Sequence, residues 1–517
     1  MIWRNIKFFE EHKMKPNSFY ITTTLPYVNS DPHIGFAMEI IRADVIARAK
    51  KLQGYEVFFN TGTDEHGQKL FDSAKKVGKE VQVYVDEYAE KFKDLKNILG
   101  ISDDVHFIRT TDEHHVKSAQ EFWKRCKENG YIYKKTYQTK YCVGCELNKT
   151  DSELNDAGQC EIHPNMKLEL IDEENYFFKF SSFQKPLLDF YEKNINFVVP
   201  DFRFHEIKTF VERGLEDFSI SRLKSKMSWG VPVPDDENHV MYVWFDALVN
   251  YISTLGWPSP HPSPLPKGER ESLFEKFWVN GNPTQYCGKD NLRQQTAMWQ
   301  AMLMSVNLPN SHQIIINGFI TGEGGIKMSK SLGNGVDPIE VVKEYGTDAL
   351  RYFLLRELSS FEDSPFTMER FKEAYNSGLA NGLGNLVSRI MKMATTYDFV
   401  YEPLPSREDM FSNSRKIYEN TDYKFDWDYF KTFEIKKVID SIWARITGLD
   451  FIIQGRKPFL LIKTNPDEAI KDLQQLVTGL YFIAFLLEPI MPETSQKIIK
   501  LILERKMPET PLFLRKG

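Results

Sequence analysis

Residues 19–60 constrain the fold of this chain more than any other segment, because their pattern changes from strand to helix and back. Residues 19–24 are rich in β-branched and aromatic side chains, as strands are. Apolar side chains then recur at helical spacing over residues 36–47, and residues 55–60 have the composition of a second strand. A strand, a helix and a strand within about forty residues predict a βαβ unit, and such units build parallel sheets. We therefore predict an α/β fold with a parallel sheet.

Length and composition indicate a globular protein of several domains. The 517 residues correspond to three or four domains of about 150 residues each. Hydrophobic residues make up 42% and charged residues 27%, which is ordinary for packed domains and excludes a mostly disordered chain. Five cysteines are too few for a secreted scaffold framed by disulfides.

Neither a membrane span nor a secretory leader is evident in the sequence. No run reaches the roughly 20 apolar residues that a membrane span needs. The longest apolar run, residues 476–487, stops at a Glu-Pro pair and predicts a buried helix. The N-terminus lacks a long apolar stretch followed by a small-residue cleavage site. We therefore expect a cytoplasmic protein without a membrane partner.

The charge is distributed unevenly along the chain. The net charge is −6, but residues 371–517 carry 21 basic and 19 acidic side chains, so this part is slightly positive. A weakly basic C-terminal third on an acidic body is compatible with a polyanionic partner there.

Changes in composition and periodicity along the chain predict the domain boundaries. Residues 1–13 are polar and aperiodic, and Met14 is an equally good start. Residues 130–225 hold three of the five cysteines in short polar and aromatic segments. Five prolines within residues 258–267 predict a stiff surface loop without a catalytic role. The expected divisions are a possible N-terminal extension at 1–13, two halves of the sheet domain at 14–129 and 226–322, an insertion at 130–225, a connecting region at 323–370 and a helical domain at 371–517.

Cysteine and histidine spacing predicts a metal site within the insertion. The pattern is C-x2-C-x14-C-x2-H, and three thiolates with one imidazole suit tetrahedral zinc. The four side chains fill all four coordination positions of tetrahedral zinc, so we expect one structural zinc ion. The alternatives are two Cys/His pairs that occur by chance, a redox dithiol, or a catalytic zinc. Cys126 and Cys287 have no such neighbours and are expected to be packing residues. The predicted ligands are Cys142, Cys145, Cys160 and His163.

Three segments predict a nucleotide site. His33 and Gly35 stand where the first helix begins, and a helix N-terminus offers free amides to a phosphate. Asp64 follows the second strand, so it is expected in the same crevice, where it could hold an ammonium group. Lys327 and Lys330 lie in a glycine-flanked loop that suits a clamp on a polyphosphate. Each segment taken alone has a structural alternative. These are, in the same order, a turn histidine, a polar turn and a solvated basic loop.

These motifs together resemble the methionyl-tRNA synthetase family of class I aminoacyl-tRNA synthetases. A His-Ile-Gly segment after the first strand is followed about 290 residues later by Lys-Met-Ser-Lys-Ser. The resemblance runs from Phe19 to the C-terminus. It implies a Rossmann-like catalytic domain split by a zinc-knuckle insertion and followed by an α-helical bundle that binds the anticodon, with the Lys-Met-Ser-Lys-Ser loop and a stem-contact region at 323–370. Further matching segments lie at 24–29, 62–67, 219–222, 229–234, 242–247 and 288–290.

The resemblance also implies a role for individual residues. A methionine pocket matches Leu25, Tyr27, Asp64, Trp244, Ala247, Leu248, Tyr251 and Gln295. ATP-binding positions match His33, Gly35, Lys289, Asp290 and Lys330, with Asp290 on the ribose and with His33, Lys327 and Lys330 as the catalytic set. Anticodon-reading positions match Asn385, Arg389 and Phe459.

Four positions depart from the family pattern. Phe36 replaces the second histidine of the His-Ile-Gly-His signature, which removes one phosphate donor. Gln295 stands where a histidine is expected, and it can still form hydrogen bonds. Gln294 replaces an aromatic residue of the pocket. Phe459 replaces the anticodon-stacking tryptophan, with less area for a base.

The activity implied by the resemblance is ATP-dependent ligation of L-methionine to the 3′ end of initiator and elongator methionine tRNA through methionyl-adenylate. Mg²⁺ is expected to arrive with ATP, and the protein is expected to act by positioning and charge stabilisation without a general base. We expect a monomer. Two alternatives remain at this point: a synthetase for leucine or isoleucine, and a tRNA-binding protein that has lost catalysis.

Overall fold

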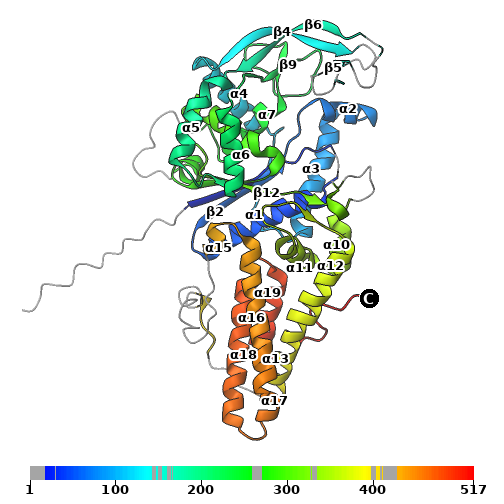
Figure 1. Cartoon of the computed structure of the whole chain (residues 1–517), viewed down its shortest axis with the longest axis vertical. Helices are drawn as coiled ribbons and strands as arrows, with labels where there is room; N and C mark the ends of the chain where they lie inside the picture. Colours follow the sequence, from blue (N-terminus) through cyan, green and yellow to red (C-terminus); the bar gives the residue numbers. More distant parts are fainter. Residues whose placement is uncertain are drawn as a thin grey trace, which may run out of the picture.

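The computed structural model describes residues 18–29, 31–142, 147–149, 154–155, 157–159, 165, 167–258, 271–326, 328, 335–397, 403–407, 410 and 428–517. Three regions are stacked along the long axis in Figure 1. A small antiparallel sheet lies at the top, a parallel sheet with its helices lies in the middle, and a bundle of long helices extends downward.

The central sheet has six strands within the described residues, and every pairing in it is parallel. This confirms the α/β fold that residues 19–60 predict. The chain builds outward from β1 to β3 and then restarts on the other side of β1 with β11, so the order reverses between β1 and β11. In such sheets ligands bind beyond the carboxyl ends of the strands at this reversal. The strands in spatial order are β3 (His106–Arg109), β2 (Glu56–Thr63), β1 (Ser18–Thr23), β11 (Asn282–Gly288), β12 (Gln313–Asn317) and β7 (Val198–Val199).

Helix α1 (Ile34–Leu52) lies between the sheet and the bundle. Fourteen of its residues are buried, including the polar Arg42 and Asp44, because it is covered on both sides. Arg351 donates to Asp44 Oδ2 at 2.8 Å and to the carbonyl oxygen of Ile490 at 2.8 Å, which joins α1 to the bundle. Burial alone would raise the pKa of Asp44, but Arg351 and Arg48 hold that pKa below its usual value. The middle of α1 is thus tied to the bundle by a buried ion pair.

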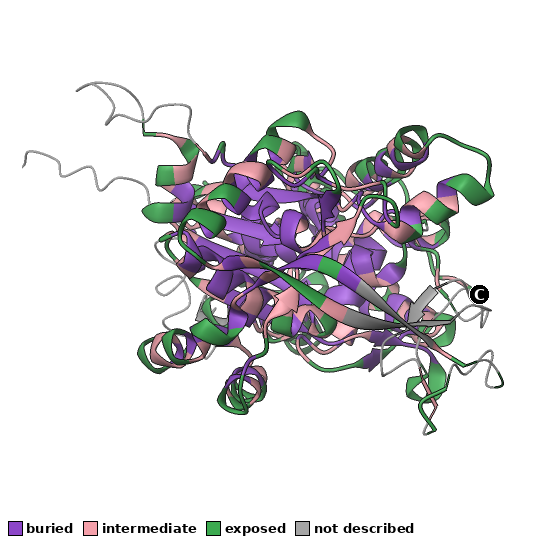
Figure 2. Cartoon of the chain, turned by 90° about the horizontal axis from the view of Figure 1, so that it is seen from above, coloured by how far each residue is buried: buried purple, intermediate pink, exposed green. Residues whose placement is uncertain are grey.

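Buried apolar side chains form two clusters, one on each face of the central sheet. Side chains alternate along β1, so Phe19 and Ile21 join the cluster on the α1 side while Tyr20 joins the other. The first cluster continues into the helical bundle. The second lies among α4 (Glu113–Glu128), α5 (Gln184–Lys193), α6 (Asp201–Glu212), α8 (Asn250–Ser253) and α9 (Trp299–Ser305). Figure 2 shows this buried interior surrounded by exposed helices and loops.

Residues 130–225 contain the second sheet and two helices that return to the centre. The sheet is antiparallel in the order β5-β4-β6-β8, and its long hairpin lies at the top of Figure 1. Strand β7 falls in the same stretch but pairs with β12 of the central sheet. The strands of the second sheet are β4 (Ile132–Cys142), β5 (Leu147–Lys149), β6 (Glu169–Phe178) and β8 (Phe218–Ser219).

The remaining elements before residue 327 connect the strands and helices already described. They are α2 (Gln68–Lys76), α3 (Val81–Ile98), η2 (Phe180–Phe183), β9 (Ser221–Leu223), β10 (His239–Met241), α7 (Val243–Ala247), η3 (Glu275–Val279), η4 (Lys289–Asn291), η5 (Gln294–Met298), β13 (Ile320–Thr321) and η6 (Glu323–Gly325).

The helical domain expected at residues 371–517 is present, and its succession of helices begins somewhat earlier in the chain. Helix α18 (Pro466–Leu487) is long and apolar enough to span a membrane by composition, but 67% of that stretch is buried in the bundle, where residues 476–487 were predicted to form a buried helix. The other elements are α10 (Pro338–Tyr345), α11 (Thr347–Tyr352), η8 (Phe353–Glu357), β14 (Ser364–Pro365), α12 (Met368–Ala374), η9 (Tyr375–Gly384), α13 (Asn385–Thr396), α15 (Asp428–Lys431), α16 (Ile435–Arg456), α17 (Pro458–Leu461) and α19 (Pro492–Glu504).

Candidate active site

A cavity of about 1670 Å³ opens at the carboxyl ends of β1, β2 and β11, at the point where the strand order reverses. The topology places it where an open parallel sheet binds its ligands. Eleven residues predicted for the methionine and ATP sites line it, although they are spread over 270 positions of sequence. They are Leu25, Tyr27, His33, Gly35, Asp64, Trp244, Ala247, Leu248, Tyr251, Asp290 and Gln295.

The carboxylate of Asp64 is the most unusual group in this cavity. Main-chain hydrogen bonds with Pro26 and Val28 fix its backbone at the end of β2. Its Oδ1 atom is buried and has no hydrogen-bond partner among the described residues. Burial raises the pKa of Asp64 well above its ordinary value, and the negative charge of Asp246 adds to this. A cation placed against Asp64 would relieve both effects.

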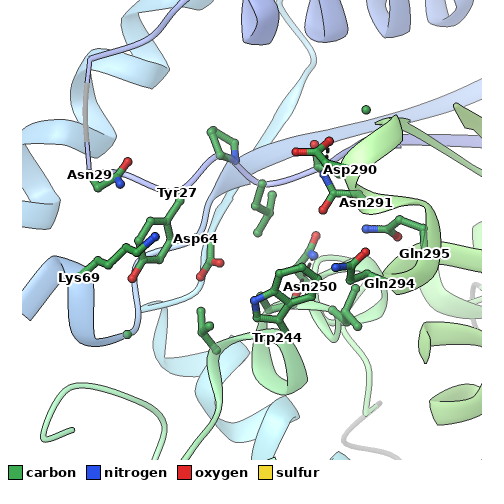
Figure 3. Close-up of a pocket in the computed structure, with 18 of the residues that line it drawn as sticks. Tyr27, Asn29, Asp64, Lys69, Trp244, Asn250, Asp290, Asn291, Gln294 and Gln295 are labelled. Atoms are coloured by element: carbon green, nitrogen blue, oxygen red, sulfur yellow. Dashed lines mark hydrogen bonds between the residues drawn. The ribbon is translucent and has the colours of Figure 1, made fainter. Parts of the chain in front are cut away.

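Apolar and aromatic side chains surround that carboxylate. Figure 3 shows Asp64 between Tyr27 on one side and Trp244 with Asn250 on the other. Tyr251 is 2% exposed, and its ring packs against Trp299 with 5.9 Å between centroids. This arrangement combines one anionic anchor with an adjoining pocket for an unbranched, polarisable side chain.

A buried pair of polar side chains that the sequence analysis did not predict holds this wall in place. His66 Nδ1 and Asp246 Oδ2 are 2.7 Å apart, and both side chains are buried. Burial raises the pKa of Asp246, while His66 opposes the shift. The indole of Trp229 donates to the carbonyl oxygen of Glu65 at 2.6 Å. These contacts tie the loop after β2 to α7, which carries Trp244.

His33 caps the start of α1 and also lines the cavity. Its Nδ1 accepts from the backbone N–H of Gly35 at 3.1 Å and from that of Phe36 at 3.4 Å. Because Nδ1 is the acceptor, the ring proton sits on Nε2, where it can be donated to an anion. A Cβ atom at position 35 would lie 3.1 Å from the His33 ring, so glycine lets the ring fold back over the helix end.

Phe36 lies in the apolar core, although it also contributes to the cavity wall. It is 7% exposed and meets Phe92 of α3 edge to face, with ring centroids 5.2 Å apart. The aromatic side chain at this position therefore stabilises the packing of α3 on α1.

Glu39 is a second functional candidate that the sequence analysis missed. It lines the cavity one turn into α1, and Thr24 donates to its Oε1 from the backbone N–H at 2.9 Å and from the hydroxyl. Burial raises the pKa of Glu39 to about 8. Its apolar helical neighbours offered no pattern that would mark it, because its position near Asp290 arises only from the fold.

Lys289 and Asp290 are adjacent in sequence but have different environments. Asp290 lines the cavity, and a Cβ atom at Gly288 would lie 2.7 Å from its carboxylate. Lys289 is not among the lining residues. Its ammonium pairs with Asp363 at 2.7 Å and lies 4.5 Å from the centre of the Phe319 ring. The structure therefore brings the predicted Asp290, but not Lys289, to the cavity.

Several predicted residues fall outside the described part of the chain. These are Lys327, Lys330, Cys145, Cys160 and His163, while only the backbone of Cys142 is described, as the last residue of β4. Within the described residues, no group of three or more His, Cys, Asp or Glu side chains could hold a metal ion. Cys126 and Cys287 are buried free thiols, as predicted.

The three residues expected to read an anticodon lie on the bundle. Asn385 begins α13 and is exposed, and Arg389 follows one turn later and forms an ion pair with Asp450 of α16. Phe459 on α17 is 39% exposed. Both helices belong to the lower half of Figure 1, and the Tyr397 hydroxyl, just after α13, donates to the carbonyl oxygen of Phe459 at 3.3 Å.

A parallel sheet with a ligand cavity at its reversal point and a helical bundle behind it is the architecture expected of a class I aminoacyl-tRNA synthetase. The family described as "tRNA synthetases class I (M)" matches residues 19–391. Among curated relatives, a methionine–tRNA ligase of Thermotoga maritima is 41% identical over 93% of this chain and 75% of its own length. One of Rickettsia prowazekii is 38% identical over 93% and 92%. This chain belongs to the methionine–tRNA ligase family.

Solved structures agree with this assignment. Mycobacterium tuberculosis methionyl-tRNA synthetase in complex with methionyl-adenylate has 32% identity and a TM-score of 0.80, with 94% of each chain covered. The free form of the same enzyme has 29% identity and a TM-score of 0.75, with 98% of this chain and all of the other covered.

Proposed function

We propose that this chain activates L-methionine with ATP to give methionyl-adenylate and then transfers the methionyl group to the 3′ end of methionine tRNA. The observation that carries the proposal is the buried Oδ1 atom of Asp64, which has no hydrogen-bond partner among the described residues and lies beside an apolar and aromatic pocket. Curated relatives are named for this reaction, and a solved relative holds methionyl-adenylate.

Asp64 receives the α-ammonium group of methionine in this proposal. Binding converts a destabilised carboxylate into an ion pair, which gives the cavity a strong preference for an amino acid. The methionine side chain then extends along the walls formed by the remaining predicted residues of the pocket. These are Leu25, Tyr27, Trp244, Ala247, Leu248, Tyr251 and Gln295.

ATP occupies the other end of the cavity. The α1 N-terminus and His33 Nε2 contact phosphate oxygens, Asp290 binds the ribose, and Lys327 and Lys330 close over the pyrophosphate. The methionine carboxylate attacks the α-phosphorus in line, so a general base is unnecessary. Magnesium enters with the nucleotide and neutralises phosphate charge. Lys289, which pairs with Asp363, supports the ATP site from outside the cavity.

A structural zinc ion is proposed for the tip of the insertion. Cys142 is the last residue of β4 and pairs with Leu147 of β5. Together with Cys145, Cys160 and His163 it gives a donor set of three thiolates and one imidazole, which suits tetrahedral zinc. When bound, the ion cross-links a segment that has few apolar residues of its own.

The bundle is proposed to bind the anticodon through Asn385, Arg389 and Phe459. The ion pair with Asp450 holds the Arg389 guanidinium on the helix surface, and the half-exposed Phe459 ring offers a face for stacking. We further propose that the protein acts as a cytoplasmic monomer with the domain boundaries given above.

Amino-acid-dependent ATP–pyrophosphate exchange tests the proposal. Methionine should support exchange, whereas leucine, isoleucine and valine should not. Exchange with another amino acid would contradict the substrate, and tRNA binding by folded protein without any exchange would identify a binding protein that has lost catalysis. Charging of methionine tRNA tests the second step separately.

A further inference from the structure

Five buried polar side chains form a continuous chain of hydrogen bonds that ends at the cavity. Gln300 Nε2 donates to Ser311 Oγ at 3.1 Å, and Ser311 Oγ donates to Gln285 Oε1 at 2.5 Å. Gln285 Nε2 donates to Gln295 Oε1 at 2.6 Å, and Gln295 Nε2 donates to the Tyr251 hydroxyl at 2.7 Å. Each residue is at most 3% exposed, and only Gln295 and Tyr251 line the cavity.

Two backbone groups fix the direction of every bond in this chain. The N–H of Ser311, which can only donate, points at Gln300 Oε1 at 3.0 Å. The carbonyl oxygen of Gln295, which can only accept, lies 2.8 Å from Gln300 Nε2. The Gln300 amide therefore has one orientation, and the Ser311 hydroxyl must donate its hydrogen bond to Gln285. Each following amide must then present its nitrogen to the next oxygen.

The direction of these hydrogen bonds determines where the Tyr251 hydroxyl proton points. Its oxygen accepts from Gln295, so its own proton points elsewhere, and no described residue supplies an acceptor for it. The ring cannot swing freely, because Tyr20 donates to the Tyr251 carbonyl oxygen at 2.9 Å and Trp299 packs against the ring. A directed hydroxyl donor therefore remains in the wall of the cavity.

We propose that Gln285 is a specificity-positioning residue, which orients Gln295 so that the Tyr251 hydroxyl donates to the sulfur of the bound amino acid. The inference rests on the proposed function and deepens it. A thioether sulfur accepts a weak hydrogen bond, whereas the methylene of norleucine, its unbranched isostere, accepts none. Apolar contacts alone distinguish such similar groups poorly.

The variant Gln285→Met tests this inference because methionine has similar length without a polar end. The readout is the ratio of kcat/KM for methionine over norleucine in ATP–pyrophosphate exchange, with the ratio of the two dissociation constants from tryptophan fluorescence as a second measure. We expect the ratio to fall about five- to tenfold, as for one lost hydrogen bond. Gln313→Met is the matched control, since among the described residues that amide donates to the Asn196 carbonyl oxygen and to none of the five buried side chains, and it should leave the ratio unchanged.

A double-mutant cycle separates positioning from general damage to the pocket. In a Tyr251→Phe background no hydroxyl remains to be directed, so Gln285→Met should have no further effect on the ratio. Ser311→Ala, a smaller change further along the chain, should lower the ratio in the same direction and serves if Gln285→Met does not fold.

An unchanged ratio in folded Gln285→Met, or an equal effect in the Tyr251→Phe background, would overturn the inference. Failure of the proposed function gives a different result: wild-type protein that shows no exchange with methionine. The ratio of dissociation constants still tests the role of Gln285 in that case.

Discussion

Replacing Glu39 by glutamine should stabilise the protein in a way that grows with pH. Burial raises the pKa of Glu39 from 4.5 to about 8, whereas in the unfolded chain it titrates near the ordinary value. Between these two values the native state holds a proton that the unfolded state has lost, so the free energy of unfolding falls as pH rises. Glutamine accepts the same bonds from Thr24 without ionising.

The magnitude follows from the difference between the two pKa values. That difference is about 3.5, and one pKa unit corresponds to about 1.4 kcal/mol, so the full effect is about 5 kcal/mol. We expect Glu39→Gln and wild type to have similar free energies of unfolding near pH 4.5. The variant should gain about 1.4 kcal/mol per pH unit, up to about 5 kcal/mol at pH 8.

Urea unfolding followed by tryptophan fluorescence at pH 5, 6, 7 and 8 measures this gap. Glu56→Gln is the control for the substitution itself, because this carboxylate is exposed on the adjoining strand, where it pairs with Lys276. A pH-independent gap for Glu39→Gln, or one that shrinks as pH rises, would refute the reasoning.

The other predictions concern the proposed reaction. Asp64→Asn should raise the KM for methionine in ATP–pyrophosphate exchange by about a hundredfold. In wild type the KM should fall as rising pH ionises Asp64, and this fall should be absent in the variant. An unaltered KM would contradict the role of Asp64. Lys330→Ala should slow exchange about a hundredfold while methionine binding, measured by fluorescence, stays within severalfold. Arg389→Ala should weaken tRNA charging and spare exchange, and an equal loss of both would place the anticodon elsewhere. Cys145→Ala should lose zinc by elemental analysis, and full occupancy would disprove the knuckle.

Local sequence patterns were sufficient for the parallel sheet and for part of one cavity. The residues that end β1 and β2 and begin α1 are close in sequence, and the carboxyl ends of parallel strands meet at one edge of the sheet. His33 and Asp64 could therefore be placed together from strand and helix patterns. The later wall residues, such as Trp244, followed from the resemblance to a family rather than from periodicity.

Only the tertiary structure determined which buried polar side chains lie in and around the cavity. Glu39 lies on an apolar helix, and its burial beside Asp290 depends on contacts more than 200 residues apart. The pairing of His66 with Asp246 spans 180 positions, and Gln285 meets Gln295 across two different elements. Spacing along a chain reports which face of a helix or strand a side chain occupies. Whether a polar group loses its water, and which partner it then finds, is determined by long-range packing that no local pattern encodes.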